Sequence, residues 1–318
     1  MKRNRSHTTT ITRFLLPLLA LFVVLAAGGP AVAASGVKAQ KTFADPETAA
    51  KSLVTAVKNN DSKELLAILG PGAQTIISSG DPVEDQAGRE RFVKLYEEKC
   101  VIAGADSGRA VLTLGQEEYP FPIPVVKKGA KWSFDTKAGK EELLNRRIGR
   151  NELQTIEVLR AYVEAQREYA GKDRDGDGTA AFAQRIRSTP GKHDGLYWEP
   201  KEGEEESPLG PFAAKAAREG YKQSKGDKPT PYHGYLFRIL KAQGGNAEGG
   251  AFDYVVNGKM ILGFAMVAYP AQYNASGVMT FVVNQNGDVY QKDLGRDTAK
   301  TAAAMKLYNP DKSWKKVE

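Results

Sequence analysis

The sequence predicts an α+β fold, because two patterns follow one another along the chain. Apolar residues recur at helical spacing in the first part, whereas later segments alternate apolar and polar residues between turn-forming residues. Helices followed by antiparallel strands are typical of the α+β class. We therefore expect N-terminal helices with a curled antiparallel sheet, and then a long helix packed on an antiparallel meander.

Residues 1–34 have the composition of a secretory signal peptide. A basic stretch at residues 2–13 precedes an apolar run at residues 14–27, and Ala-Val-Ala at residues 31–33 supplies a cleavage site. The apolar run is short for a membrane span. We therefore expect a mature protein that begins at Ala34 or Ser35, that is periplasmic or secreted, and that has no stable membrane insertion.

Composition argues against nucleic-acid binding and against an internal disulfide. The formal charge of +7 falls to +3 once the four basic residues of the leader are lost, and no stripe of Lys or Arg alternates with aromatic residues. A nucleic-acid partner is therefore not expected. Cys100 is the only cysteine, so the chain cannot form an internal disulfide.

The first structural unit is expected over residues 43–136. Asp45 followed by Pro46 is a typical helix start, and the run Tyr-Pro-Phe-Pro-Ile-Pro at residues 119–124 fits an extended sheet edge. We expect helices at residues 46–58, 62–69 and 87–99, and strands at residues 100–103, 109–114, 125–128 and 131–135. This order of elements resembles the cone-shaped folds of the nuclear-transport-factor-two-like group. The resemblance implies either a ligand held inside the cone or a plain interaction module.

The second unit is expected over residues 141–318. Gly149 is expected to separate a short helix from a long one, whose apolar face carries Leu153, Ile156, Leu159 and Val163. This face should be buried against strands around Phe252, Val267 and Phe281. Asn257-Gly258 predicts a hairpin, and residues 278–283 should pair with residues 288–292.

Four segments resemble a family of exported bacterial proteins known as domain of unknown function 2950. They are residues 188–198, the motif Tyr232-His233-Gly234-Tyr235, residues 276–281 and residues 287–295. This resemblance extends over nearly the whole mature chain. It implies export and brings no established activity.

The second unit is also similar to the soluble part of type IV pilin-like and pseudopilin proteins. An amphipathic helix at residues 159–169 precedes a long loop, alternating hairpins and a final Gly-x-Val-Tyr hairpin. The chain departs from that group because it has no prepilin cleavage signature and no hydrophobic helix that feeds the sheet. Filament assembly through a helical core is therefore not expected.

Asp173, Asp175 and Asp177 begin a pattern similar to an EF-hand calcium loop, with a glycine at the sixth position. The twelfth position is Gln184, where an EF-hand has a bidentate glutamate. Two interpretations remain, a solvated turn and a weak calcium site. No other cofactor is expected.

Histidine and aromatic residues gather in two segments of the second unit. We expect these segments to pack side by side, either as a ligand surface or as a seal of the long loop onto the sheet. The candidate binding residues are His193, Asp194, Tyr197, Trp198, Tyr232, His233 and Tyr235.

These patterns favour an exported envelope module that binds an envelope protein or a surface polymer without catalysis. The alternative is a periplasmic hydrolase with a site around His193, Asp194 and His233. The sequence has no Gly-x-Ser-x-Gly elbow and no paired metal-binding histidines to support it.

Overall fold

The computed structural model describes residues 39–222 and 230–318. The predicted signal peptide at residues 1–34 lies outside them. The described residues form one compact unit of helices and antiparallel sheets, which confirms the α+β class. Two separate hydrophobic cores lie within this unit, one between Phe43 and Phe134 (the N-terminal core) and one between Leu159 and Tyr308 (the C-terminal core).

The N-terminal helices begin at caps that the sequence makes visible. Asp45, Asp61 and Asp81 each accept hydrogen bonds from backbone N–H groups of the helix that follows them. The helices are α1 (Pro46–Lys58), α2 (Ser62–Leu69), α3 (Gln74–Ile77) and α4 (Pro82–Glu98). The helix expected at residues 87–99 therefore begins earlier, at Pro82, because Asp81-Pro82 is a cap followed by proline.

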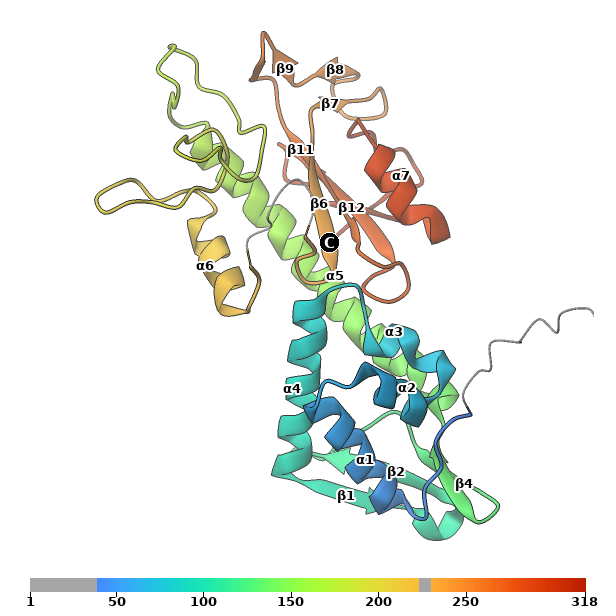
Figure 1. The fold of residues 1–318 in the computed structure, drawn as a ribbon. Coiled ribbons are helices and arrows are strands. Elements are labelled where there is room, and N and C mark those ends of the chain that lie inside the picture. The colour runs from blue at the N-terminus through green and yellow to red at the C-terminus, as the bar shows by residue number, and fades with distance from the viewer. Residues whose placement is uncertain (1–38, 223–229) are drawn as a thin grey trace, which may run out of the picture. The chain divides into compact units, whose positions relative to one another are not determined.

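The N-terminal sheet is antiparallel and has the strand order β1-β2-β4-β5, with β3 paired to β2. Strands β1, β2 and β4 of this sheet are labelled in Figure 1. Its strands are β1 (Cys100–Ala103), β2 (Arg109–Leu114), β3 (Tyr119–Pro120), β4 (Val125–Lys128) and β5 (Lys131–Phe134). Strands β1, β2, β4 and β5 were predicted. The proline-rich run, expected as an extended edge, pairs with β2 through Tyr119 and Pro120, and the Phe121 N–H donates to the carbonyl oxygen of Leu112. Proline has no N–H to donate, which limits how far such a run can join a ladder.

Helix α5 (Thr136–Tyr169) is continuous, so the break expected at Gly149 is wrong. It contributes Leu143 to the N-terminal core and Leu159 to the C-terminal core. Burial at both ends outweighs the cost of one helical glycine, about 1 kcal/mol. At Gly139 the helix lies so close to the chain before β4 that an added Cβ would be 2.2 Å from the carbonyl oxygen of Pro122.

Four residues were expected on the apolar face of α5. Two of them are buried, one is partly buried against the core, and one is exposed. Leu159 and Val163 are buried and Ile156 packs against the C-terminal core, whereas Leu153 is 66 % exposed. Val267 and Phe281 are buried in the same core, and Phe252 packs against it. Leu153 faces solvent because the buried stripe of the helix passes through Asn151 and Thr155 instead.

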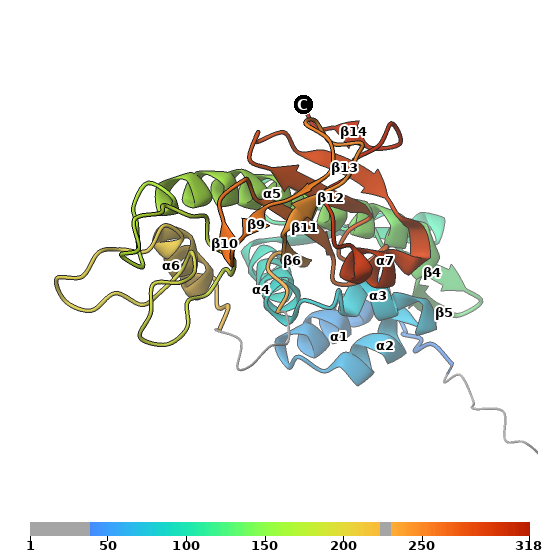
Figure 2. The same ribbon diagram turned by 90° about the horizontal axis from the view of Figure 1, so that it is seen from above.

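The C-terminal sheet has the antiparallel order β14-β13-β12-β11-β6. Helix α5 contacts β11 and β12, and α7 also contacts β11 (Figure 2). All six residues of β11 are buried, as expected for a central strand covered on both faces. The elements are α6 (Gly210–Arg218), β6 (Tyr235–Leu240), β7 (Ala242–Gln243), β8 (Phe252–Asp253), β9 (Val255–Val256), β10 (Lys259–Met260), β11 (Ala265–Pro270), β12 (Met279–Asn284), β13 (Tyr290–Asp293), α7 (Thr298–Ala304) and β14 (Lys315–Lys316).

The predicted hairpins are present, with β9 paired to β10 across Asn257-Gly258 and β12 paired to β13. Among residues 39–222 and 230–318, no helix combines the length and the apolar character needed to cross a bilayer.

A substitution at Gly149 would measure how much glycine lowers the stability of α5. An added Cβ at this exposed position would meet nothing within 4 Å. We therefore expect Gly149→Ala to raise the free energy of unfolding by about 0.5–1 kcal/mol. Urea denaturation of both proteins would measure this gain, and a loss of stability would mean that the helix bends at Gly149 in solution.

Candidate functional site

A cavity of about 440 Å³ opens beside the N-terminal core. Its walls are mostly apolar and come from the first four helices, from α5, and from β2 and the chain that follows it. They comprise Leu53, Val57, Leu65, Leu69, Ile76, Ile77, Phe92, Leu95, Leu114, Phe121 and Leu143. A cavity of this size and character is within the usual range of small-molecule sites.

Five arginines also line this cavity, and two carboxylates, Glu84 and Asp85, accompany them. Arg89 and Arg91 come from α4, whereas Arg146, Arg147 and Arg150 come from α5. On α5 these arginines follow Leu143 at steps of three and four residues, which places them on one helical face. The apolar cavity therefore has a basic rim.

Two of the arginines have structural roles. Arg89 donates to the carbonyl oxygen of Ile77 at 2.9 Å, and Arg147 donates to the carbonyl oxygens of Thr75 and Ile76. These carbonyls form the C-terminal end of α3, where helix carbonyls lack partners and the helix dipole is negative. Burial lowers the pKa of the Arg147 guanidinium from its ordinary value.

The guanidiniums of Arg91 and Arg150 have weaker contacts than those of Arg89 and Arg147. Their nearest ion-pair partner is the same atom, Glu84 Oε2, at 3.7 Å from Arg91 and 3.9 Å from Arg150. Within the described residues neither guanidinium donates a hydrogen bond, and their side chains are 52 % and 43 % exposed. Burial, followed by repulsion from Arg91, lowers the pKa of Arg150.

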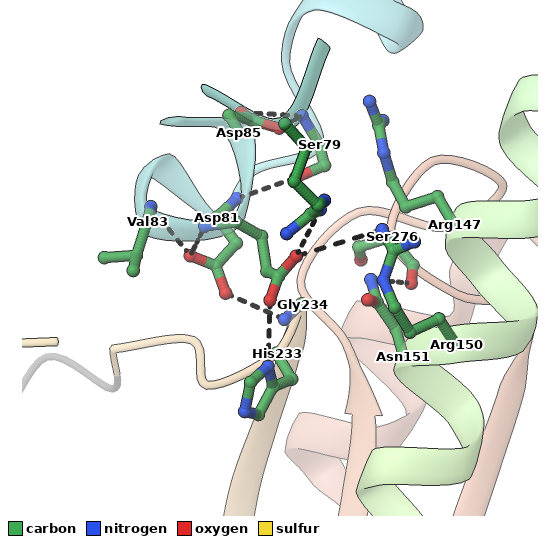
Figure 3. A network of polar contacts seen from close by, with 12 residues as sticks. Ser79, Asp81, Val83, Asp85, Arg147, Arg150, Asn151, His233, Gly234 and Ser276 are labelled. Carbon is green, nitrogen blue, oxygen red and sulfur yellow. Dashed lines mark hydrogen bonds and ion pairs between the residues drawn. The ribbon is translucent and has the colours of Figure 1, made fainter. Parts of the chain in front are cut away.

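Glu84 is held from its other side by His233, whose neighbour Gly234 lies beside Asp81 in Figure 3. His233 Nδ1 lies 2.9 Å from Glu84 Oε1, and this contact is the main reason that the pKa of Glu84 is lowered. His233 Nε2 lies 3.1 Å from Glu219 Oε2, a distance typical of an ion pair, but this nitrogen makes no hydrogen bond with a described residue. The imidazole therefore lies between two carboxylates.

His233 and Gly234 form a tight turn that the cap of α4 holds in place. Both have positive φ values, and Tyr232 and Tyr235 exchange backbone hydrogen bonds around them, as in a hairpin turn. Gly234 N donates to Asp81 Oδ2 at 2.8 Å. Glycine is required here, since φ is +76° and a Cβ would lie 2.5 Å from Asn151 Nδ2.

Asp81 is fully buried and connects three segments of the chain. Its Oδ1 caps α4 by accepting from Val83 and Glu84, and its Oδ2 accepts from Gly234 and from the Tyr221 hydroxyl at 2.9 Å. Burial raises the pKa of Asp81, and the hydrogen bonds offset part of this effect. The side chain thus fixes the turn that presents His233 to Glu84.

The candidate residues of the first predicted segment lie around a second cavity, of about 490 Å³, or beside it. His193 stacks on Trp198 with ring centres 4.3 Å apart, and Asp194 accepts from the Thr189 backbone at 2.7 Å. Trp198 is buried and donates to the carbonyl of Glu205, while Tyr197 is half-buried. These contacts fold the long loop onto itself.

The second predicted segment has different partners. Tyr232 contacts Tyr221 and donates to Glu219 at 3.2 Å, and the buried Tyr235 donates to the carbonyl of Met279. In the described residues no hydrogen bond, ion pair or ring contact joins this segment to His193, Asp194 or Trp198. The segment at His233 reaches the arginine-rimmed cavity, through Glu84.

The side chains of Asp173, Asp175 and Asp177 converge. One oxygen from each lies within 4.8 Å of the others, and all three residues are exposed. The ammonium of Lys259 reaches the same place, since its Nζ lies 3.0 Å from Asp175 Oδ1 and also contacts Asp177. Gln184 is engaged elsewhere, donating to the carbonyl of Gly258.

A calcium ion at this place would have to compete with an internal cation, the ammonium of Lys259. We expect wild-type affinity in the millimolar range, as in weak extracellular modules, and tighter binding by Lys259→Gln. Calorimetric titration of both proteins with calcium chloride would test this, with Asp175→Ala as the variant that loses the site. Equal binding by all three proteins would show that calcium binds elsewhere or not at all.

The arginine rim, Glu84 and Asp81 were missed by the sequence reasoning. One signal was available, because Asp81-Pro82 repeats the cap and proline of Asp45-Pro46 and would have placed Glu84 on α4. No local pattern in the sequence indicates that Glu84 meets Arg150 and His233. Glu84 and His233, for example, are 149 positions apart in sequence.

Comparison with curated proteins and with solved structures finds no match in either set. A family model described as "Protein of unknown function (DUF2950)" matches residues 40–317, which include both cores and the cavity. The match confirms the family that the four sequence segments indicated. The chain therefore belongs to the DUF2950 family.

Proposed function

We propose that this protein is an exported, non-catalytic binding module of the cell envelope, and that the arginine-rimmed cavity is its ligand site. One observation carries the proposal: the apolar cavity has Arg91 and Arg150 at its rim, each with donors that no described residue uses. Apolar walls with a few placed polar groups are typical of ligand sites. The ligand can be free, or carried on an envelope protein or a surface polymer.

The hydrolase alternative has less support. Both ring nitrogens of His233 face carboxylates, and neither contact involves a serine or cysteine nucleophile. Asp194 is engaged with Thr189 and Arg185, and His193 stacks on Trp198. General-base catalysis needs the base within hydrogen-bond reach of the group it activates.

Export is testable by itself. We expect N-terminal sequencing of the protein from a periplasmic or secreted fraction to give a chain that begins at Ala34 or Ser35. Recovery of the intact N-terminus in the inner membrane would contradict the envelope assignment.

Ligand entry is testable with Nile red, a neutral dye whose fluorescence rises in apolar surroundings. Gly88 lines the cavity, and an added Cβ there would meet only Arg91 Nη2, at 3.8 Å. We expect saturable dye binding by the wild type, its loss in Gly88→Leu, and its retention in Gly149→Ala. Dye binding that survives Gly88→Leu would place the ligand outside this cavity.

Gly88→Leu should not lose binding through unfolding. Leucine is a better helix former than glycine by about 0.8 kcal/mol, and the new side chain has the cavity to occupy. The thermal melting temperature of this variant should therefore equal or exceed that of the wild type.

A further inference from the structure

The walls and the rim of the cavity present opposite chemistries. The inner surface carries leucine, isoleucine and phenylalanine side chains, whereas the guanidiniums of Arg91 and Arg150 are about half exposed. A neutral apolar molecule would fill the walls and leave the arginines without new partners. A small inorganic anion would pair with the arginines and leave the walls uncovered.

Glycine at position 88 keeps part of this space open. Helix α4 has no fully buried residue along its length, although it packs against α1 and against strands β1 and β2. A glycine in the interior of a helix lowers its stability relative to alanine. Here the missing side chain leaves room beside Arg91.

The charge at the rim is not balanced locally. Arg91 and Arg150 share the single carboxylate of Glu84, whose other oxygen is taken by His233. Glu84 Oε2 itself is buried and has no hydrogen-bond partner. The two arginines and Glu84 together keep one unit of positive charge, and the other three arginines of the rim exceed Asp85 by two more, so the rim attracts an anionic group.

We infer that the ligand of this cavity is an anionic amphiphile, with one apolar chain against the walls and a carboxylate or phosphate head on Arg91 and Arg150. This inference rests on the proposed function, since it names the ligand of the same site. Guanidinium groups form strong, often bidentate hydrogen bonds with both carboxylates and phosphates. The apolar chain would supply most of the affinity, and the arginines would select for the charged head.

The test is competition against bound Nile red, with dodecanoate, dodecyl phosphate and dodecanol as competitors below the concentrations at which they form micelles. We expect at least one of the two anions to displace the dye at a concentration about tenfold or more below that of dodecanol. A tenfold preference corresponds to 1.4 kcal/mol. Displacement by one anion alone would identify the head group as a carboxylate or as a phosphate.

The double variant Arg91→Gln, Arg150→Gln should bind Nile red as the wild type does and lose the preference for the anions. Arg160→Gln is the matched control, because Arg160 is an exposed residue of α5 outside the cavity. This control should keep the full preference. Thermal melts of all variants would show that each one is folded.

The possible failures are distinguishable. Absence of saturable Nile red binding by the wild type would overturn the proposed site and the inference together. Dye binding that dodecanol and the anions displace equally would overturn the inference alone. A preference for the anions that persists in the double variant would also overturn it, since the head group would then lie elsewhere.

Discussion

Replacement of Asp81 by alanine is expected to lower the free energy of unfolding by about 3–5 kcal/mol, because four donors lose one buried acceptor group. Loss of the helix cap alone costs about 1 kcal/mol. The remaining loss of stability comes from the Tyr221 hydroxyl and the Gly234 N–H. Both donate hydrogen bonds to the buried carboxylate of Asp81 and would lose this acceptor in the variant. Chemical denaturation monitored by circular dichroism would give the difference.

Asp61→Ala is the matched control for this prediction. Asp61 caps α2 through the N–H groups of Lys63 and Glu64, and its side chain makes no further hydrogen bond in the described residues. We expect this substitution to cost about 1 kcal/mol. Equal losses for the two variants would mean that Asp81 acts only as a helix cap.

Leu159→Ala is expected to lower the free energy of unfolding by about 2–5 kcal/mol. Leu159 is 0 % exposed within the C-terminal core, so truncation removes buried methyl groups and leaves a cavity in a closely packed region. Thermal or urea denaturation would measure the loss.

Leu153→Ala makes the same chemical change on the same helix and serves as the control. Since Leu153 is 66 % exposed, its truncation should change stability by no more than about 0.5 kcal/mol. A large loss of stability in Leu153→Ala would mean that Leu153 is buried, as the sequence predicted, and not exposed as in the structure.

These two leucines show what helical periodicity could and could not predict. The helical spacing of apolar residues predicted a buried stripe on α5, and Leu159 and Val163 are indeed buried. Burial of an apolar face is the main source of helix stability, which is why this spacing is informative. It failed at Leu153, since the stripe continues there through the polar residues Asn151 and Thr155. Asn151 is buried because its amide donates to the carbonyl of Ser276, a partner that no local pattern reveals.

Local signals also explain which elements were found. Cap residues, prolines and the Asn257-Gly258 turn act over a few neighbours, so α1, α2 and the hairpins could be predicted from the sequence. Gly149 was misleading because propensity is a weak preference that packing overrides.

The candidate cavity depends on contacts between distant segments. Arg150 on α5 and Glu84 on α4 meet only after the chain has folded, and the same holds for Glu84 and His233. The individual residue types are common on helices and carry no specific motif. The pattern Arg146-Arg147-x-x-Arg150 could have indicated a basic face, but not the apolar walls behind it.

The continuity of α5 decides how this protein can be divided for experiment. At 34 residues the helix is about 50 Å long, and its first turns supply Leu143 to one core while its last turns supply Tyr169 to the other. A fragment that ends at residue 136 would lack Leu143 and the three rim arginines that α5 supplies. A fragment that begins at residue 141 would carry those arginines without α4. Neither piece contains a complete cavity, so we expect ligand binding to need a single expressed chain that spans residues 40–317.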